Sequence, residues 1–157
     1  MSDLDTTFLK KSIEIATLSV NQGGGPFGAI IVKDDTIIST GNNQVTINND
    51  PTAHAEIIAI RNACQTLASF TLEGCILYSS CEPCPMCMSA IYWSRLDRVV
   101  FAATEKDAAK AGFDDANIAR ELALPYTSRS IKVEHVKCEG HDACFTAWQN
   151  KPDKTSY

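Results

Sequence analysis

The sequence predicts an α/β fold in three layers, in which a mixed five-stranded sheet carries helices on both faces. Two observations support this prediction. Short apolar runs rich in β-branched residues alternate along the chain with longer segments in which apolar residues recur every three or four positions. An opening hairpin precedes this alternation, and the combination is typical of a sheet that contains antiparallel and parallel neighbours.

The first elements are a helix and a hairpin. Apolar residues at helical spacing, among them Leu9, Ile13 and Ala16, predict a helix over 5–21, which a glycine-rich stretch ends. The runs FGAIIVK (27–33) and TIIST (36–40) then predict two strands. Only two residues separate them, so we expect a tight hairpin.

The remaining elements alternate. A turn-rich loop at 48–51 leads into helical spacing over 53–68. The segments that follow are predicted in this order: strand 76–79, helix 84–94, strand 98–103, helix 106–111, helix 117–122, strand 131–136 and helix 143–150.

Length and composition limit the class of protein. The 157 residues suit one domain spanning 1–157, with 45% hydrophobic and 21% charged residues. No apolar run approaches the roughly 20 residues that cross a bilayer, and the N-terminus lacks the pattern of a secretion signal. We therefore expect a cytoplasmic protein with no membrane partner. The net charge of −5 favours a small substrate over a nucleic acid.

Two short stretches carry the chemistry. The first is His54-Ala55-Glu56, at the start of a predicted helix. The second is SSCEPCPMC (79–87), in which Cys84 and Cys87 are three residues apart at the start of another helix. Residues at i and i+3 share a helix face, and a helix N-terminus favours the thiolate. One imidazole and two thiolates are a ligand set that suits zinc.

Three protein ligands leave the fourth position of a tetrahedral zinc for water, which can ionise near neutral pH. Glu56 is then the candidate proton carrier, two residues from His54. The alternative is a closed structural zinc with Cys81 as fourth ligand. We favour the open, catalytic site with one zinc per subunit, because a domain of this size folds without metal and Cys81 precedes a proline-containing turn.

The pattern H-x-E followed by P-C-x-x-C is the signature of zinc-dependent nucleobase deaminases. Beyond this motif, the chain closely resembles bacterial guanine deaminases of the cytidine-deaminase-like superfamily. The segments that carry the resemblance are GGPFGAIIVKD (24–34), NNDPTAHAEIIAIRNAC (48–64), LYSSCEPCPMCMSAIYW (77–93) and DAAKAGFDD (107–115). The resemblance implies hydrolysis of guanine to xanthine and ammonia.

The resemblance also implies roles for individual residues. His54, Cys84 and Cys87 would bind zinc, and Glu56 would carry protons. The purine pocket would be formed by Phe27, Asn43, the backbone at Ala55, Trp93 and Asp115, with Asp115 also assisting proton transfer. Family members form homodimers that exchange C-terminal segments, here about 140–157. Tyr157 would thus reach the neighbouring subunit's site, with Asn49 nearby.

Each pocket residue also has a purely structural interpretation. Phe27 and Trp93 could be ordinary packing residues, Tyr157 a frayed end, and either Asp114 or Asp115 the cap of the helix near 117. A second metal site at Cys138, His141 and Cys144 has no support beyond composition.

Three other functions remain open. The chemistry could serve a related amine such as guanosine, cytosine or a triazine. It could serve an adenosine in tRNA, although an acidic chain supplies a poor surface for RNA. The third alternative is a zinc-binding domain without enzymatic activity, in which Glu56 would have no catalytic role.

Overall fold

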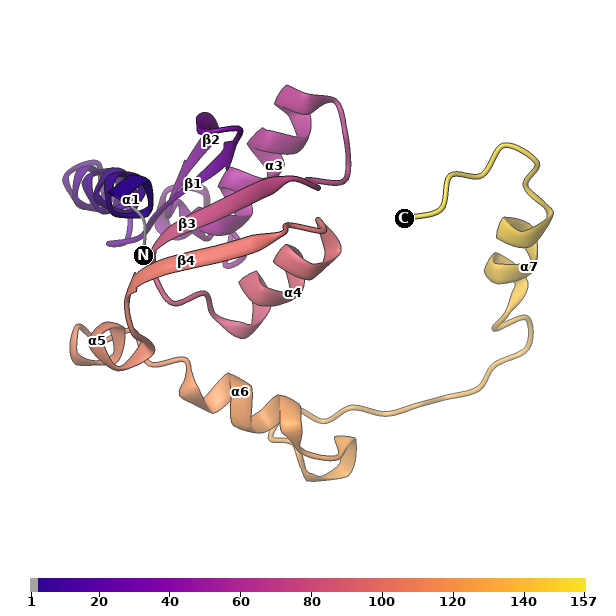
Figure 1. Ribbon diagram of the computed structural model, residues 1–157. Helices are drawn as coiled ribbons and strands as arrows, with labels where there is room; N and C mark the ends of the chain where they lie inside the picture. Colours follow the sequence, from indigo (N-terminus) through magenta and orange to yellow (C-terminus); the bar gives the residue numbers. More distant parts are fainter. Residues whose placement is uncertain (1–2) are drawn as a thin grey trace. The chain divides into compact units, whose positions relative to one another are not determined.

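The computed structural model describes residues 3–157. The chain divides into two compact units, of which the first ends at Ile118 and the second runs from Ala119 to Tyr157. The sheet and the helices that pack on it belong to the first unit (Figure 1). Among residues 3–157, no helix combines the length and the apolar character needed to cross a bilayer.

The sheet has four strands in the order β2-β1-β3-β4. Their bounds are β1 Gly28–Lys33, β2 Thr36–Asn42, β3 Cys75–Cys81 and β4 Arg98–Ala103. β1 is antiparallel to both β2 and β3, whereas β3 and β4 are parallel. It follows that β2, β3 and β4 run in one direction and β1 alone runs in the other. The mixed sheet that the sequence predicts is confirmed.

The prediction of a fifth strand at 131–136 is wrong. Apolar and polar side chains alternate there, but within residues 3–157 the segment pairs with no strand. Its apolar side chains Ile131, Val133 and Val136 are exposed. Alternation specifies which side chains share a face of a strand, and it does not specify a partner for the backbone.

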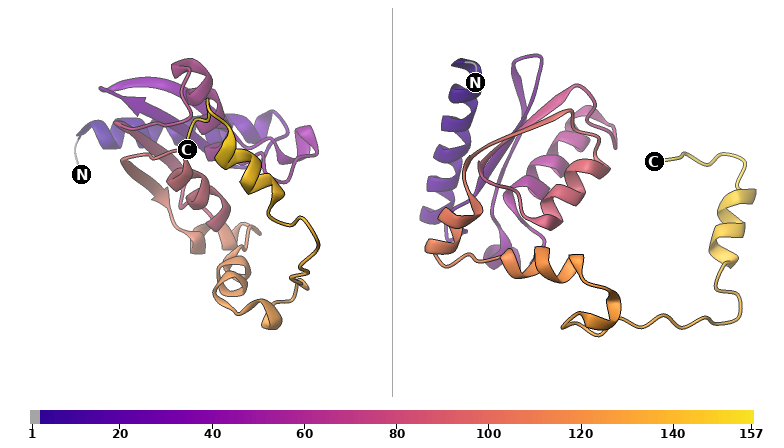
Figure 2. Two further views of the ribbon diagram at one scale, coloured as in Figure 1. Left: turned by 90° about the vertical axis from the view of Figure 1, so that its right-hand side faces the viewer. Right: turned by 60° about the horizontal axis from the view of Figure 1, so that its bottom comes forward.

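Helices cover both faces of the sheet, as expected (Figures 1 and 2). α1 (Asp3–Asn21) packs on one face, where its Phe8 and Leu9 meet Ile30 of β1. α3 (Ala55–Leu67) and α4 (Pro85–Trp93) pack on the opposite face. Successive residues of β1 therefore point into two separate apolar cores, which explains why every residue of the strand before Lys33 is buried.

Two glycines allow helix backbones to lie directly on the sheet. A Cβ at Gly28 would collide with the backbone of α1 at Ser12 and Ala16. A Cβ at Gly41 would collide with the backbone of α3 at Ala55 and Ala59. The second approach matters for function, because it presses the first turn of α3 against β2.

The hairpin turn is the tight one that the sequence predicts. Asp34 and Asp35 both adopt left-handed conformations, with φ of 47° and 58°. Turns of this kind match the right-handed twist of the two strands that they join.

Short helices complete the chain. They are α2 (Val45–Asn48), which the sequence did not predict, α5 (Glu105–Lys110), α6 (Ala116–Ala123), a 3₁₀ turn at Tyr126–Ser128 and α7 (Ala143–Asn150). The second unit has local contacts of its own. Arg129 donates to the carbonyls of Leu122 and Leu124, and the rings of Trp148 and Tyr157 meet edge to face with centroids 6.5 Å apart.

A buried carboxylate ties α1 to the sheet. Asp5 accepts two hydrogen bonds of 2.9 Å from the Arg98 guanidinium and one of 2.8 Å from the Tyr78 hydroxyl. The Asp5 side chain is only 3% exposed. Burial and the neighbouring carboxylate raise the pKa of Tyr78 to about 12, so that the phenol keeps its proton throughout the physiological range.

We expect Arg98→Met to lower the free energy of unfolding by about 2 kcal/mol, because it leaves the buried Asp5 without its counter-ion. Arg61→Met is the matched control. Its ion pair with Asp50 is exposed and spans 4.0 Å, so its loss should cost about 0.5 kcal/mol or less. Urea denaturation of both variants measures the difference. Equal losses would contradict this assignment.

Candidate active site

The direction of the strands gathers the functional residues at one edge of the sheet. β2, β3 and β4 all end at this edge, and β1 begins there. α3 begins after β2, and α4 begins directly after β3. The N-termini of both helices therefore lie at the same edge, close to Phe27 before β1 and Asn43 after β2.

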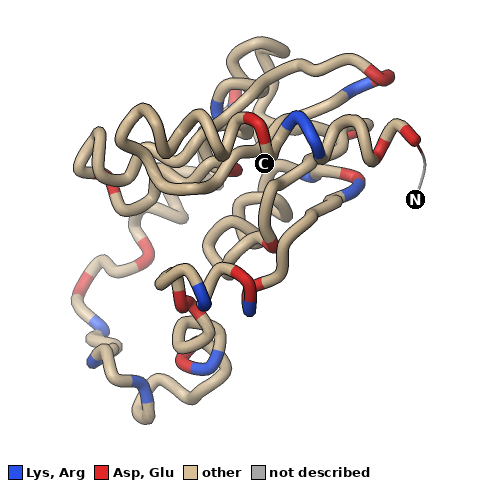
Figure 3. The backbone as a smooth tube through the Cα atoms, turned by 90° about the vertical axis from the view of Figure 1, so that its left-hand side faces the viewer, with Lys and Arg blue, Asp and Glu red and all other residues tan. Residues whose placement is uncertain are grey.

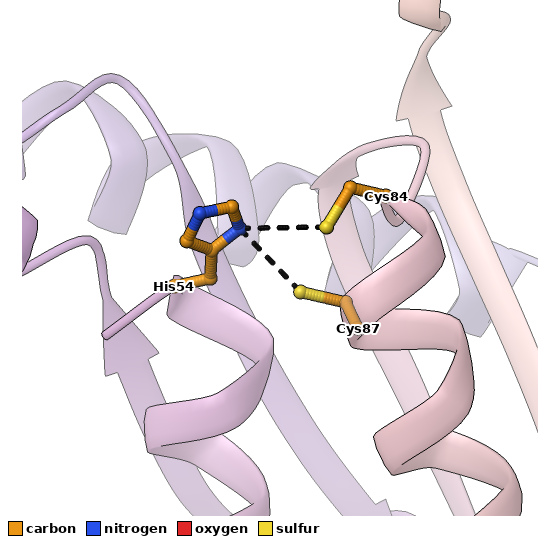
Figure 4. A group of neighbouring side chains, drawn as sticks. All are labelled: His54, Cys84 and Cys87. Atoms are coloured by element: carbon orange, nitrogen blue, oxygen red, sulfur yellow. Dashed lines mark hydrogen bonds between the residues drawn. The ribbon is translucent and has the colours of Figure 1, made fainter. Parts of the chain in front are cut away.

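Three side chains at these helix starts converge (Figure 4). His54 is the N-cap of α3, Cys84 is the N-cap of α4, and Cys87 lies in the first turn of α4. The Nδ1 of His54 is 3.6 Å from the Sγ of Cys84 and 3.6 Å from the Sγ of Cys87. All three ligand atoms lie within 4.8 Å of one another.

This geometry fits zinc. Bonds of about 2.0–2.3 Å to nitrogen and sulfur place the ligand atoms of a tetrahedral site roughly 3.5–3.8 Å apart. The His54–Cys distances fall within that range. One imidazole and two thiols are also a donor set that zinc prefers. The three residues are the zinc ligands that the sequence predicts.

The electrostatics of the cluster favour a cation. Hydrogen bonds from Cys87 and His54 lower the pKa of Cys84 to about 4. The neighbouring Cys84 and burial raise the pKa of Cys87. Cys84 also raises the pKa of His54. One thiolate is thus present at neutral pH, and a metal ion would displace the proton that Cys87 retains.

Cys81 does not belong to the cluster. It lies at the end of β3, where its buried Sγ is 3.6 Å from the carbonyl oxygen of Thr104. Within the described residues, the metal-binding group consists of His54, Cys84 and Cys87. This favours the open three-ligand site over the closed one.

The possible second metal site at Cys138, His141 and Cys144 also finds no support in the structure. Cys138 and Cys144 are exposed, and among residues 3–157 they join no group of metal-binding side chains.

Glu56 lies beside the metal ligands and is 5% exposed. Its Oε1 accepts a hydrogen bond of 3.1 Å from the Ser79 hydroxyl, and its Oε2 is 3.5 Å from the Sγ of Cys87. Burial raises the pKa of Glu56. A carboxyl group that can hold or release a proton therefore adjoins the site where zinc would activate water.

A cavity of about 830 Å³ opens onto these groups. Its lining includes six of the predicted site residues: Phe27, Asn43, His54, Glu56, Cys84 and Asp115. The volume is within the range usual for pockets that bind small molecules. Ala55 is fully buried and is not among the residues that line the cavity, so the contact of its backbone with a ligand stays a prediction.

One predicted pocket residue is absent from the cavity lining, and another belongs to the second unit. Trp93 is at the C-terminal end of α4, is 69% exposed, and is not among the residues that line the cavity. Tyr157 belongs to the second unit and is also exposed. Asn49 ends α2 in a left-handed conformation. Their proposed roles stay predictions.

The structure decides which aspartate caps α6. The Asp114 carboxylate accepts the Ala116 N–H at 3.1 Å. Asp115 is therefore not needed as the cap, and it lines the cavity. Burial and the nearby Cys84 raise the pKa of its carboxyl group.

Asn43 is held in a defined orientation. Its Oδ1 accepts the N–H groups of Gly25 at 3.4 Å and Val45 at 3.3 Å. A Cβ at Gly25 would lie 3.0 Å from the Asn43 side chain, which would then have to shift. With its oxygen occupied, Asn43 offers its NH₂ group to a ligand.

Sequence reasoning missed some residues of the site. Phe113 packs edge to face on Phe27, with ring centroids 5.0 Å apart, and lines the cavity. Glu82, Glu105 and Asp114 add carboxylates to the lining, which includes no Lys or Arg from the described residues. The run GFDD (112–115) contained Phe113, but nothing in its spacing pointed to a contact with a residue more than 80 positions away.

The chain is similar to known deaminases. Residues 2–103 match the family described as the cytidine and deoxycytidylate deaminase zinc-binding region. A guanine deaminase from Bacillus subtilis (strain 168) is 53% identical over 152 residues, which cover 96% of this chain and 97% of that protein.

The similarity extends to structure and to a second activity. The X-ray structure of guanine deaminase from Bacillus subtilis superimposes with a TM-score of 0.95 at 51% identity, covering 100% of this chain and 99% of that one. A tRNA-specific adenosine deaminase from Aquifex aeolicus (strain VF5) is 48% identical over 99 residues, which cover 63% of this chain and 66% of that protein.

The ligand set can be tested by metal analysis. We expect Cys84→Ser to lose most of its zinc, because a neutral hydroxyl replaces a thiolate ligand. Cys81→Ser, the matched control in the same motif, should keep close to one zinc per chain. Elemental analysis of the purified variants gives the answer. Zinc lost from Cys81→Ser would restore the four-ligand alternative.

Proposed function

The chain belongs to the cytidine and deoxycytidylate deaminase family of zinc-binding proteins, and from this premise we propose that it hydrolyses guanine to xanthine and ammonia. One observation of the structure carries the proposal. A buried carboxylate adjoins a His/Cys/Cys group in a cavity large enough for a purine. The similarity to guanine deaminases over nearly the full chain supports the choice of substrate.

His54, Cys84 and Cys87 would hold one zinc ion per subunit. When bound, zinc supplies Lewis-acid activation that makes water a nucleophile near neutral pH. Glu56 accepts the proton that the attacking water releases and passes it to N3 of the purine ring. Protonation of N3 makes C2 more electrophilic. A second proton, taken from the hydroxyl group added to C2 and moved by Glu56 or Asp115, reaches the amino group. The bond from C2 to this nitrogen then breaks, ammonia leaves, and C2 becomes a carbonyl carbon of xanthine.

The cavity supplies contacts for a purine base. Phe27 offers an aromatic face, held in place by the ring of Phe113. The Oδ1 of Asn43 is occupied by two backbone N–H groups, so its NH₂ group would donate to an acceptor atom of guanine. Asp115 offers an acceptor for the ring N–H groups. The backbone at Ala55 completes the proposed set.

Charge disfavours nucleotides and RNA as substrates. Carboxylates of Glu82, Glu105, Asp114 and Asp115 line the cavity, and they would repel a phosphate group. Lys and Arg are interspersed with Asp and Glu along the first unit (Figure 3). The Aquifex aeolicus relative is named for deamination of adenosine in tRNA. An RNA substrate suits this cavity less well than a neutral free base does.

We also propose that residues 1–157 form one deaminase domain and that its C-terminal segment, about 140–157, is exchanged between the subunits of a homodimer. The second unit exposes apolar side chains that a partner surface would cover: Ile131, Val136, Phe145 and Trp148. Tyr157 would then close the site of the neighbouring subunit, with Trp93 and Asn49 close by. A cytoplasmic location and a role in purine catabolism belong to the same proposal.

Glu56→Gln tests the catalytic role. We expect a loss of at least about 10²-fold in kcat for guanine with zinc content unchanged, because the amide cannot carry protons. Ammonia release is measured with guanine, guanosine, adenine, cytosine and a tRNA anticodon stem-loop. Ammonia release by the wild-type enzyme from guanine alone would support guanine as the substrate. Full activity in Glu56→Gln, or turnover of another amine instead of guanine, would contradict the proposal.

Co-expression of two inactive variants tests the exchange of segments. Glu56→Gln lacks the proton carrier, and Tyr157→Ala lacks the residue donated by the partner. With random pairing about half of the dimers contain one chain of each kind, and each such dimer has one complete site. Activity should thus recover to roughly a quarter of the wild-type value. No recovery in confirmed mixed dimers would show that the tail serves its own subunit.

A further inference from the structure

The carboxylate of Glu56 is held by a hydroxyl that belongs to the sheet. Ser79 Oγ donates to Glu56 Oε1 at 3.1 Å, and Ser79 is only 2% exposed. The other carboxylate oxygen lies 3.5 Å from the Sγ of Cys87. A cysteine that binds zinc does so as a thiolate and has no proton to donate. Among the described side chains, Ser79 is therefore the donor that Glu56 keeps when zinc is bound.

Ser79 is itself fixed in place. Its backbone lies in β3, between Ala29 of β1 and Phe101 of β4. Side chains alternate along a strand, so Ser79 points to the same face as Leu77, which packs against α3. The Cys81 N–H is directed at Ser79 Oγ from 3.5 Å. This contact occupies the hydroxyl as an acceptor and leaves its proton for Glu56.

We propose that Ser79 is a positioning residue, which holds the Glu56 carboxylate so that its second oxygen faces the metal ligands. The inference rests on the function proposed above. The final torsion of a glutamate side chain is soft, so a carboxylate without this hydroxyl can rotate. A buried oxygen would also lose its donor. A misplaced proton carrier slows the chemical step more than it weakens substrate binding.

Three variants of the zinc-loaded enzyme test the proposal: Ser79→Ala, Ser79→Thr and Ser39→Ala. Ser39 is the matched control, because its buried hydroxyl donates to the α3 carbonyl of Ala59 at 2.7 Å and does not contact Glu56. We would measure kcat, KM for guanine, zinc content and urea stability for each.

Ser79→Ala should lower kcat about tenfold, the loss expected for a hydrogen bond to a charged group, with KM within about twofold and zinc unchanged. Ser79→Thr keeps the hydroxyl and should retain most of the kcat. Ser39→Ala should lose stability and keep its kcat.

Three results would overturn the positioning role. They are a wild-type kcat in Ser79→Ala, a Ser79→Thr variant as slow as Ser79→Ala, and a loss of zinc from Ser79→Ala. If Glu56→Gln is inactive while Ser79→Ala is fully active, the positioning role fails and the proposed function stands. If the wild-type enzyme releases no ammonia from guanine, both fail together.

Discussion

The site depends on the close approach of α3 to Gly41 in β2. With no Cβ at this position, the backbone of α3 at Ala55 and Ala59 can lie directly on the strand. This contact sets the distance between the sheet and the start of α3, which carries His54 and Glu56. Ligand atoms must meet within a few tenths of an ångström to bind zinc. A methyl group at Gly41 would therefore displace the first turn of α3 and disturb the metal site.

The second half of the metal site is positioned by a different route. β3 is held between β1 and β4, and α4 begins only a few residues after it ends. Pro85 occupies the first turn of α4, where a missing N–H costs nothing. Cys84 and Cys87, three residues apart at the start of α4, then both face His54 (Figure 4). The starts of two helices thus bring the three donors together.

Polar groups buried behind the site explain the orientation of the Glu56 side chain. Ser79 comes from the sheet, Glu56 from α3 and Cys87 from α4, and their contacts run in sequence from one element to the next. Each buried polar atom finds a partner, and no buried side-chain nitrogen or oxygen of residues 3–157 is left without one. Such a chain keeps a charged side chain in one orientation within an apolar core. The negative character of the cavity has a different source, the carboxylates of Glu82, Glu105, Asp114 and Asp115 in its lining.

The sequence predicts every helix and strand of the first unit except α2. It also predicts the three metal ligands and the neighbouring Glu56. These features follow from local patterns: helical and alternating periodicity, and ligand spacing at i and i+3. Other features become visible only in the folded chain. Cys81 stays out of the metal group, and Asp114 caps α6 and leaves Asp115 to the cavity. Phe113 and Ser79 support the site. The tertiary structure also removed the fifth strand, since the alternation at 131–136 carries no information about a pairing partner. Contacts between residues far apart in the chain arise from strand order and helix packing, which no local pattern encodes.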